Sequence, residues 1–322
     1  MALLQWTKIL TIIDGRTKTM KQAQIRLITL CSVLCCGVMS TVVAQQCKGI
    51  PQFMIAHGFD PARSAMSSQE NRKRGVVLIE LSNMANPGST RNKSYQHPSW
   101  LLPGYAGSIT TGRNGDIYVL PKANVNMLYN PPENQNTIYR IDSKTGILTS
   151  WVKIPMPRIP DEHNASGLLS AFYDCDTDAL IVSTVAGSRQ KEEIGAIYSV
   201  KASTGETKRI LDKTDVLGLL TANLNNERRL LYGSARRSEI WSVALDASNH
   251  VTGAPRLEIL LEGLGPRGDD KARKLRMDTN GMLQVFGVPF YYNLTAPVER
   301  QETVYVFEYN PVKKVWTLKS MN

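Results

Sequence analysis

Histidine and cysteine are scarce in this chain of 322 residues, and their scarcity narrows the chemistry that it can carry. The four histidines are scattered, so there is no clustered zinc-binding motif. No two cysteines have C-x-x-C spacing, no serine lies in a G-x-S-x-G motif, and no glycine-rich phosphate-binding loop is present. Long helical periodicity is also missing from residues 45–322. The sequence therefore offers no recognisable nucleophile–base pair and no common cofactor fingerprint.

Charge is missing from one stretch near the N-terminus. Lys21 and Arg26 precede the uncharged segment LITLCSVLCCGVMSTVVA, which ends in small residues before Gln45. This order is the layout of a secretory signal peptide, whereas a membrane-spanning helix would be longer and poorer in Ser, Thr, Cys and Gly. We therefore expect residues 1–44 to be removed. The mature chain, residues 45–322, should be secreted or periplasmic and should have no membrane span.

The charge and the cysteines of the mature chain fit export without identifying a partner. Removing residues 1–44 lowers the net charge from +10 to +6. The basic clusters at 72–74 and 271–276 lack the interleaved aromatic residues of a single-strand binding groove, so we expect no nucleic-acid binding. Cys47 and Cys175 remain. An oxidising compartment would permit a disulfide between them, although their spacing does not show that they meet.

Two segments that start 166 residues apart repeat each other. Residues 114–139 and 280–305 align without a gap and share nine of twenty-six positions. Similar units recur between them, such as GLLSAFYD at 167–174 and GLLTANLN at 218–225. Runs rich in Val, Ile, Leu, Tyr and Trp, bounded by Asn, Asp and Gly turns, indicate short antiparallel strands. Four such strands recur with a period of roughly 45–65 residues, which is typical of β-propeller blades.

We therefore expect an all-β fold, a single β-propeller of five or six four-stranded blades. A ring of sheets buries faces that one sheet alone would leave exposed. Five blades would begin near residues 47, 104, 165, 216 and 266. The first is the loosest copy, built from QFMIAHGF, GVVLIELSN and SWLLPG. Repeated residues such as Gln135 and Gln301 hold equivalent places in such a ring, so we interpret them as structural.

The last blade carries the clearest family pattern. It reads D-x-N-G-x-L-x-V over residues 278–285 and V-Y-x-F over residues 304–307. In this it resembles the secreted propellers that include gluconolactonase-like, regucalcin-like, strictosidine-synthase-like and NHL-repeat proteins, and the resemblance extends over essentially the whole mature chain. Enzymes of that group hold a divalent cation in the central channel through carboxylate and amide oxygens. The resemblance thus implies a propeller and raises the hypothesis of a metal-dependent hydrolase.

Loop length distinguishes the two faces of the expected propeller. Because antiparallel strands alternate in direction, the loop between the second and third strands of a blade shares a face with the link to the next blade. These connections are long in most blades, and only SARRS connects the two strands in the fourth. Long loops are retained mostly where they bind something, so we expect this to be the working face. The long connections are residues 56–75, 120–136, 183–195 and 286–302, and the link PMPRIPDEHNAS.

Polar residues outside the repeat pattern lie where links enter the innermost strands. His163 and Asn164 precede the third blade, Asp215 the fourth and Asp270 the fifth. Innermost strands converge on the channel, so Asn164, Asp215 and Asp270 would offer oxygen ligands to a hard cation such as Ca²⁺. His163 would act as a base if a substrate bound beside it. Turn capping by Asp and Asn, and a solvated loop histidine, are the alternative interpretations.

Two functions therefore stay open at this point. We favour an exported propeller that binds a protein, a glycan or a small molecule through its long-loop face. The alternative is a lactonase- or esterase-type hydrolase with a cation in the central channel. The sequence does not identify the ligand or the oligomeric state.

Overall fold

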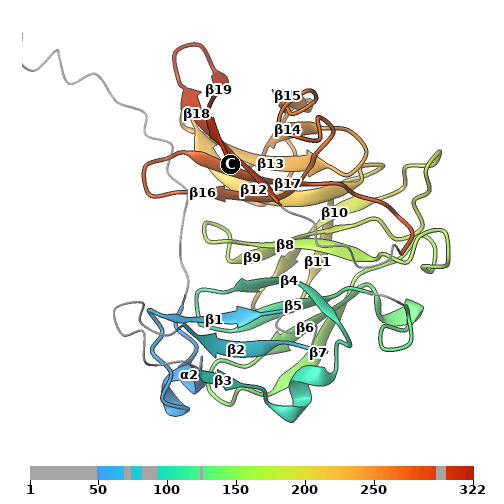
Figure 1. Cartoon of the computed structure of the whole chain (residues 1–322), viewed down its shortest axis with the longest axis vertical. Helices are drawn as coiled ribbons and strands as arrows, with labels where there is room; N and C mark the ends of the chain where they lie inside the picture. The colour runs from blue at the N-terminus through green and yellow to red at the C-terminus, as the bar shows by residue number, and fades with distance from the viewer. Residues whose placement is uncertain (1–48, 69–73, 82–92, 124–125, 295–301) are drawn as a thin grey trace, which may run out of the picture. The chain divides into compact units, whose positions relative to one another are not determined.

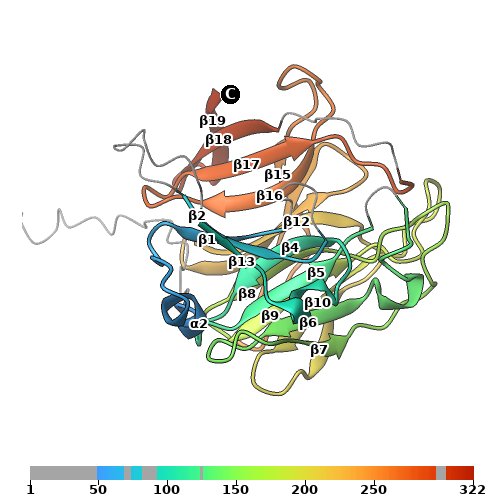
Figure 2. The ribbon, with the colours of Figure 1, turned by 60° about the horizontal axis from the view of Figure 1, so that its bottom comes forward.

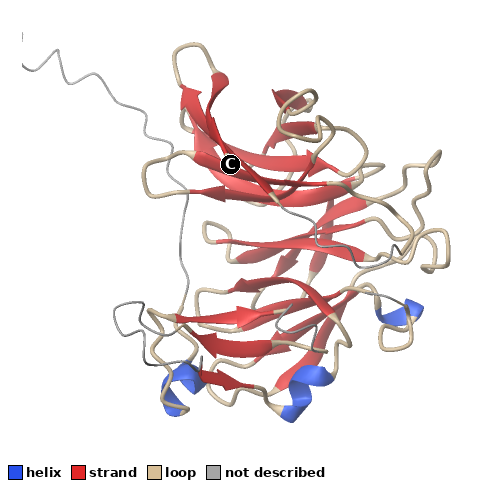
Figure 3. Cartoon of the chain, viewed as in Figure 1, coloured by secondary structure: helices blue, strands red, loops and turns tan. Residues whose placement is uncertain are grey.

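The structure is a computed structural model of the chain, and almost all of its regular structure is β-strand (Figure 3). It describes residues 49–68, 74–81, 93–123, 126–294 and 302–322, all of which lie within one unit, Val42–Asn322. No helix among these residues is long and apolar enough to cross a membrane. Residues 1–48, which include the expected signal peptide, lie outside the described part of the chain.

Four antiparallel sheets of four strands follow one another along the chain, each in sequence order from its innermost to its outermost strand (Figure 1). Blade 2 consists of β4 (Ala106–Thr111), β5 (Ile117–Pro121), β6 (Thr137–Ile141) and β7 (Leu148–Lys153), and blade 3 of β8 (Leu168–Asp174), β9 (Ala179–Thr184), β10 (Ala196–Lys201) and β11 (Thr207–Leu211). Blade 4 consists of β12 (Val216–Leu224), β13 (Glu227–Ser234), β14 (Glu239–Ala244) and β15 (Arg256–Leu260), and blade 5 of β16 (Lys271–Met277), β17 (Leu283–Val288), β18 (Thr303–Asn310) and β19 (Val315–Met321).

Blade 1 has three strands among the described residues: β1 (Ser64–Ser67), β2 (Val77–Glu80) and β3 (Lys93–Tyr95). Because β3 is followed by the link to β4, it corresponds to the fourth strand of the other blades. By the same alternation of direction, β1 and β2 correspond to the second and third strands. No described segment fills the innermost position of this blade. The prediction of one all-β propeller is confirmed, with five blades.

Two segments assigned to the first blade are helical rather than extended. QFMIA forms the short helix α2 (Gln52–Ala56), and SWLLPG begins inside the 3₁₀-helix η2 (Pro98–Leu101). The Phe53 and Trp100 rings meet edge to face, 5.6 Å apart, in the apolar cluster that joins blades 1 and 2. A single helical turn can bury Phe53 and Met54 side by side, which an extended chain, with alternating side chains, cannot. Tertiary packing therefore overrides the strand pattern here. A third helical turn, η3 (Pro132–Asn134), lies in the β5–β6 loop.

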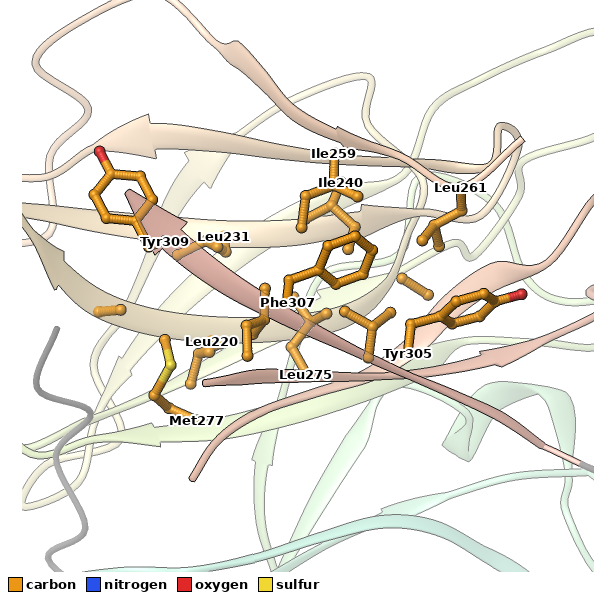
Figure 4. Close-up of a cluster of buried hydrophobic side chains, with 14 of the residues drawn as sticks. Leu220, Leu231, Ile240, Ile259, Leu261, Leu275, Met277, Tyr305, Phe307 and Tyr309 are labelled. Carbon is orange, nitrogen blue, oxygen red and sulfur yellow. The ribbon is translucent and has the colours of Figure 1, made fainter. Parts of the chain in front are cut away.

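The core consists of apolar layers between neighbouring blades. The innermost strands β4, β8, β12 and β16 contact one another in order, as the neighbouring ribbons in Figures 1 and 2 show. The second strands β5 and β9 are buried on both faces, which explains their continuous apolar runs. Figure 4 shows the layer between blades 4 and 5, where Ile240 and Ile259 meet Phe307 and Leu275.

The repeated segments occupy equivalent positions. Tyr139 pairs with Val119 in blade 2, and Tyr305 pairs with Val285 in blade 5, in each case between the third and second strands. Asn114 and Asn280 each precede a glycine with positive φ, 85° at Gly115 and 75° at Gly281, in the turn that joins the first two strands. The sequence repeats because a left-handed turn position and a buried ring recur in blades 2 and 5.

Cys175, in the turn after β8, forms a disulfide. The other four cysteines, Cys31, Cys35, Cys36 and Cys47, lie outside the described residues. The Gly49 amide donates to the carbonyl of Gly112, and the guanidinium of the neighbouring Arg113 donates to the Cys175 carbonyl. The described chain therefore begins close to Cys175.

Candidate functional site

Long connections gather on one face of the propeller, at the right of Figure 1, and we call it the loop-rich face. Residues 122–136, 185–195 and 289–302 join the second and third strands of blades 2, 3 and 5, whereas residues 235–238 suffice in blade 4. The opposite turns of blades 2, 3 and 5 are short, as at residues 112–116. One expected loop is shorter than predicted. β1 occupies part of residues 56–75, so the β1–β2 loop is residues 68–76.

Asn164 is buried at the start of blade 3, where its side chain fixes a loop of the same blade. Its Nδ2 donates to the carbonyls of Val185 and Ser188, at 2.7 and 2.8 Å, and its Oδ1 accepts from the Ser166 amide at 3.0 Å. Every polar atom of the amide is therefore engaged by backbone. Asn164 holds the β9–β10 loop in place.

Asp215 is fully buried before blade 4 and joins loops from three blades. One carboxylate oxygen accepts from the Ser188 hydroxyl at 2.5 Å and from the Gly195 amide at 3.0 Å. The other accepts from Arg236 Nε at 2.9 Å and from the Tyr292 hydroxyl at 2.5 Å. A Cβ on Gly195 would lie 2.3 Å from the Asp215 carboxylate, so a glycine is needed there. Burial, and then the bond to Asp215, raise the pKa of Tyr292 far above its usual range.

Asp270 is fully buried before blade 5 and has its own set of partners. Its two oxygens accept from Arg267 Nε and Nη2, at 2.6 and 2.9 Å, and from the Tyr305 hydroxyl at 2.8 Å. Burial opposes ionisation, but hydrogen bonds from Arg267, Tyr305 and Thr303 hold the pKa of Asp270 below its ordinary value. Burial, and then Asp270, raise the pKa of Tyr305 to about 12. The carboxylate of Asp270 stays ionised and holds the link between blades 4 and 5 against Tyr305 of blade 5.

The structure brings two of the predicted ligands to one loop and gives the third other partners. Asn164 and Asp215 both bind Ser188. The polar contacts of Asp270 are with Arg267, Tyr305 and Thr303 instead. Within the described ranges, no three His, Cys, Asp or Glu side chains are grouped so as to hold a metal ion. The side chain of His163 is largely exposed, and its Nε2 lies 3.7 Å from Glu162 Oε1.

We expect the melting temperature of the purified protein to be the same in Ca²⁺ and in EDTA. The oxygens of Asn164, Asp215 and Asp270 are already taken by protein donors. A cation bound at a hundredfold excess over its dissociation constant would instead stabilise the fold by about 2.7 kcal/mol. Differential scanning calorimetry decides between these results. A Ca²⁺-dependent rise in melting temperature, with hydrolysis of lactones, would favour the hydrolase alternative.

On the loop-rich face of blades 3 and 4, the arginine side chains form ion pairs with carboxylates of the same loops and links. Arg236 makes the largest number of bonds, because its guanidinium also donates to the carbonyls of Arg189, Gln190 and Glu192. Side chains whose charges are paired within the protein are less available to form ion pairs with a binding partner. This part of the face is therefore a rigid support rather than an open contact surface. The pairs include Arg158–Glu192 at 3.0 Å, Arg189–Asp161 at 2.5 Å, Arg236–Asp215 at 2.9 Å and Arg236–Glu193 at 3.6 Å.

The loop-rich face of blades 1 and 2 is different, because large apolar side chains are exposed to solvent on it. We call this group the Tyr129 patch: Arg74, Leu101, Leu102, Tyr105, Leu128 and Tyr129. The side chain of Leu128 is 72% exposed and that of Leu102 is 55% exposed. The Tyr105 and Tyr129 rings meet edge to face at 6.0 Å, and the Arg74 guanidinium lies 4.2 Å from the centre of the Tyr129 ring.

Backbone contacts hold the patch together. The Asn130 amide donates to the carbonyls of Pro103 and Tyr105, and its oxygen accepts from the Tyr105 amide at 3.0 Å. A Cβ on Gly104 would lie 1.8 Å from the Tyr129 carbonyl, and φ is +70° at this glycine. The loop that carries Leu128 and Tyr129 is therefore fixed against the link that carries Leu101 and Leu102.

Sequence reasoning did not single out Arg236, Tyr292, Arg74 or Tyr129. The available signal was position, because all four lie in or beside the connections expected on the working face. Their partners are far away in the sequence: Tyr292 binds a carboxylate 77 residues earlier. Only the ring of blades brings these side chains together.

Comparison with known proteins does not assign this chain to a family. No family model and no curated protein matches the sequence. Among solved structures, a chain of a nidogen/laminin complex is 9% identical, with 80% of this chain and 91% of that chain covered and a TM-score of 0.41. A luciferin-regenerating enzyme is 12% identical, with 75% and 85% covered and a TM-score of 0.43. A putative 6-phosphogluconolactonase from Bacteroides uniformis is 8% identical, with 80% and 81% covered and a TM-score of 0.42. Likenesses this distant carry no argument about function.

Proposed function

We propose that this propeller is an exported binding module whose loop-rich face takes a ligand, and that the Tyr129 patch is the centre of that face. The observation that carries the proposal is the exposure of Leu101, Leu102, Leu128 and Tyr129 on loops that are otherwise firmly anchored. Contiguous exposed apolar side chains rimmed by polar residues mark interaction sites. Tyrosine and arginine are also the residues most enriched in energetically important contacts.

Several features support a protein partner and export. Leu101, Leu102, Leu128 and Tyr129 are all exposed, and a protein surface can cover several such side chains at once. The disulfide of Cys175 fits an oxidising compartment such as the periplasm or the extracellular space. We place the hydrolase alternative second, because the oxygens of Asn164, Asp215 and Asp270 are already taken by protein donors.

A photo-crosslinking amino acid tests the proposal in the cells that export the protein. Placed at Leu128, it should give a discrete crosslinked species, because this side chain would lie in the interface. The matched control is Val312, which is 90% exposed in the β18–β19 turn on the opposite face and should give none. The crosslink at position 128 should also fall several-fold when Tyr129 is replaced by serine. Equal labelling from both positions would refute the assignment of the face.

A further inference from the structure

Arg74 differs from the other arginines on the loop-rich face. Among the described residues, the other arginines in these loops and links each pair with a carboxylate, whereas Arg74 forms no ion pair with any of them. Its guanidinium instead lies over the ring of Tyr129. The paired arginines are Arg158 with Glu192, Arg189 with Asp161, Arg236 with Asp215, Arg237 with Glu239 and Arg267 with Asp270.

The position of Arg74 prepares it to receive an anion. Stacking on Tyr129 restricts the guanidinium without using its N–H donors, so that they stay available for a planar, two-point contact with a carboxylate. Leu101 and Leu128 lie on the two connections whose backbones meet at Gly104 and Tyr129. When a partner covers these side chains, water is excluded and the charge pairing becomes stronger.

We propose that the Tyr129 patch docks a protein segment in which a carboxylate side chain lies between apolar side chains. The inference rests on the proposed binding function and specifies its partner. The carboxylate would pair with Arg74, and the apolar side chains would cover Leu102 and Leu128. A small carboxylate ligand would satisfy the arginine but would leave the leucines exposed, so the combination favours a peptide chain.

The probe is a fluorescent peptide of Leu-Glu-Leu repeats, compared with Leu-Gln-Leu and Leu-Lys-Leu peptides of the same length. Fluorescence anisotropy with the mature protein should show the acidic peptide binding at least about tenfold more tightly than the neutral one. Arg74→Glu should remove this preference and favour the Leu-Lys-Leu peptide. The control is Lys144→Glu, the same charge reversal in an exposed turn on the opposite face of blade 2, which should change nothing.

The outcomes separate this inference from the proposed function. If all peptides bind equally, and Leu128→Ser weakens them all while Arg74→Glu changes none, the binding face stands and the carboxylate preference is wrong. If no peptide binds and the Leu128 crosslink is also absent, both proposals fail. If Lys144→Glu weakens the acidic peptide as much as Arg74→Glu does, the attraction is a general charge effect, and the assignment to Arg74 is overturned. Circular dichroism of each variant shows that it is folded.

Discussion

Replacing Cys175 by serine in the mature chain should lower the free energy of unfolding by about 2–5 kcal/mol. Cys175 is disulfide-bonded, and in a chain cleaved after Ala44, as we propose, Cys47 would be the one other cysteine. A bond between them closes a loop of roughly 130 residues, and in the chain-entropy model a loop of this size constrains the unfolded state strongly. Urea unfolding of the exported protein measures the difference.

Two controls make this test specific. Cys47→Ser should match Cys175→Ser, and the wild type unfolded in the presence of a reductant should match both. Intact-mass measurement of the exported protein should show two hydrogens fewer than the fully reduced chain. A serine variant as stable as the wild type, or free thiols at both positions, would contradict the prediction.

Replacing Asp215 by alanine should destabilise the propeller by about 3–5 kcal/mol. The carboxylate is fully buried and accepts hydrogen bonds from Ser188, Gly195, Arg236 and Tyr292. Without it, two hydroxyls and an amide lose their acceptor, and the largely buried Arg236 loses its closest counter-charge. Removing one partner of a buried ion pair costs this much when the other charge stays buried, and Arg236 keeps only the more distant Glu193 at 3.6 Å.

Asp212 provides the matched control for Asp215. It lies three residues earlier in the same link, and it pairs at 2.8 Å with Arg209 while both side chains are more than half exposed. An exposed pair of this kind contributes less than about 1 kcal/mol, so Asp212→Ala should be nearly as stable as the wild type. Chemical denaturation of both variants gives the comparison. An Asp215→Ala variant within about 1 kcal/mol of the wild type would show that the loops do not depend on this carboxylate.

Some side chains on the loop-rich face hold the loops in place, whereas others are exposed. Asp215 and Asn164 anchor connections that would otherwise cost conformational entropy to order. On the same face, the apolar side chains of the Tyr129 patch stay exposed on loops that Asn130 holds. A binding surface on fixed loops loses less freedom on association, which favours affinity.

The repeat pattern alone determined the architecture. Strand composition and Asn-Gly turns are local properties, so the starts of blades 2 to 5 were predicted near 104, 165, 216 and 266, and their first strands begin at Ala106, Leu168, Val216 and Lys271. The first blade was predicted less well. Its apolar letters fit a strand or a helical turn equally, and burial of Phe53 beside Trp100 decides for the helix.

The sequence also located the loop-rich face, because loop length and strand alternation are both readable from the order of residues. It could not show what the polar residues on that face bind. Asp215 meets Tyr292 from 77 residues away, and Arg74 stacks on Tyr129 from another blade. Spacing along the chain carries no information about such contacts, since they exist only once the blades are packed side by side. Tertiary structure therefore decided which side chains hold the loops in place and which stay exposed.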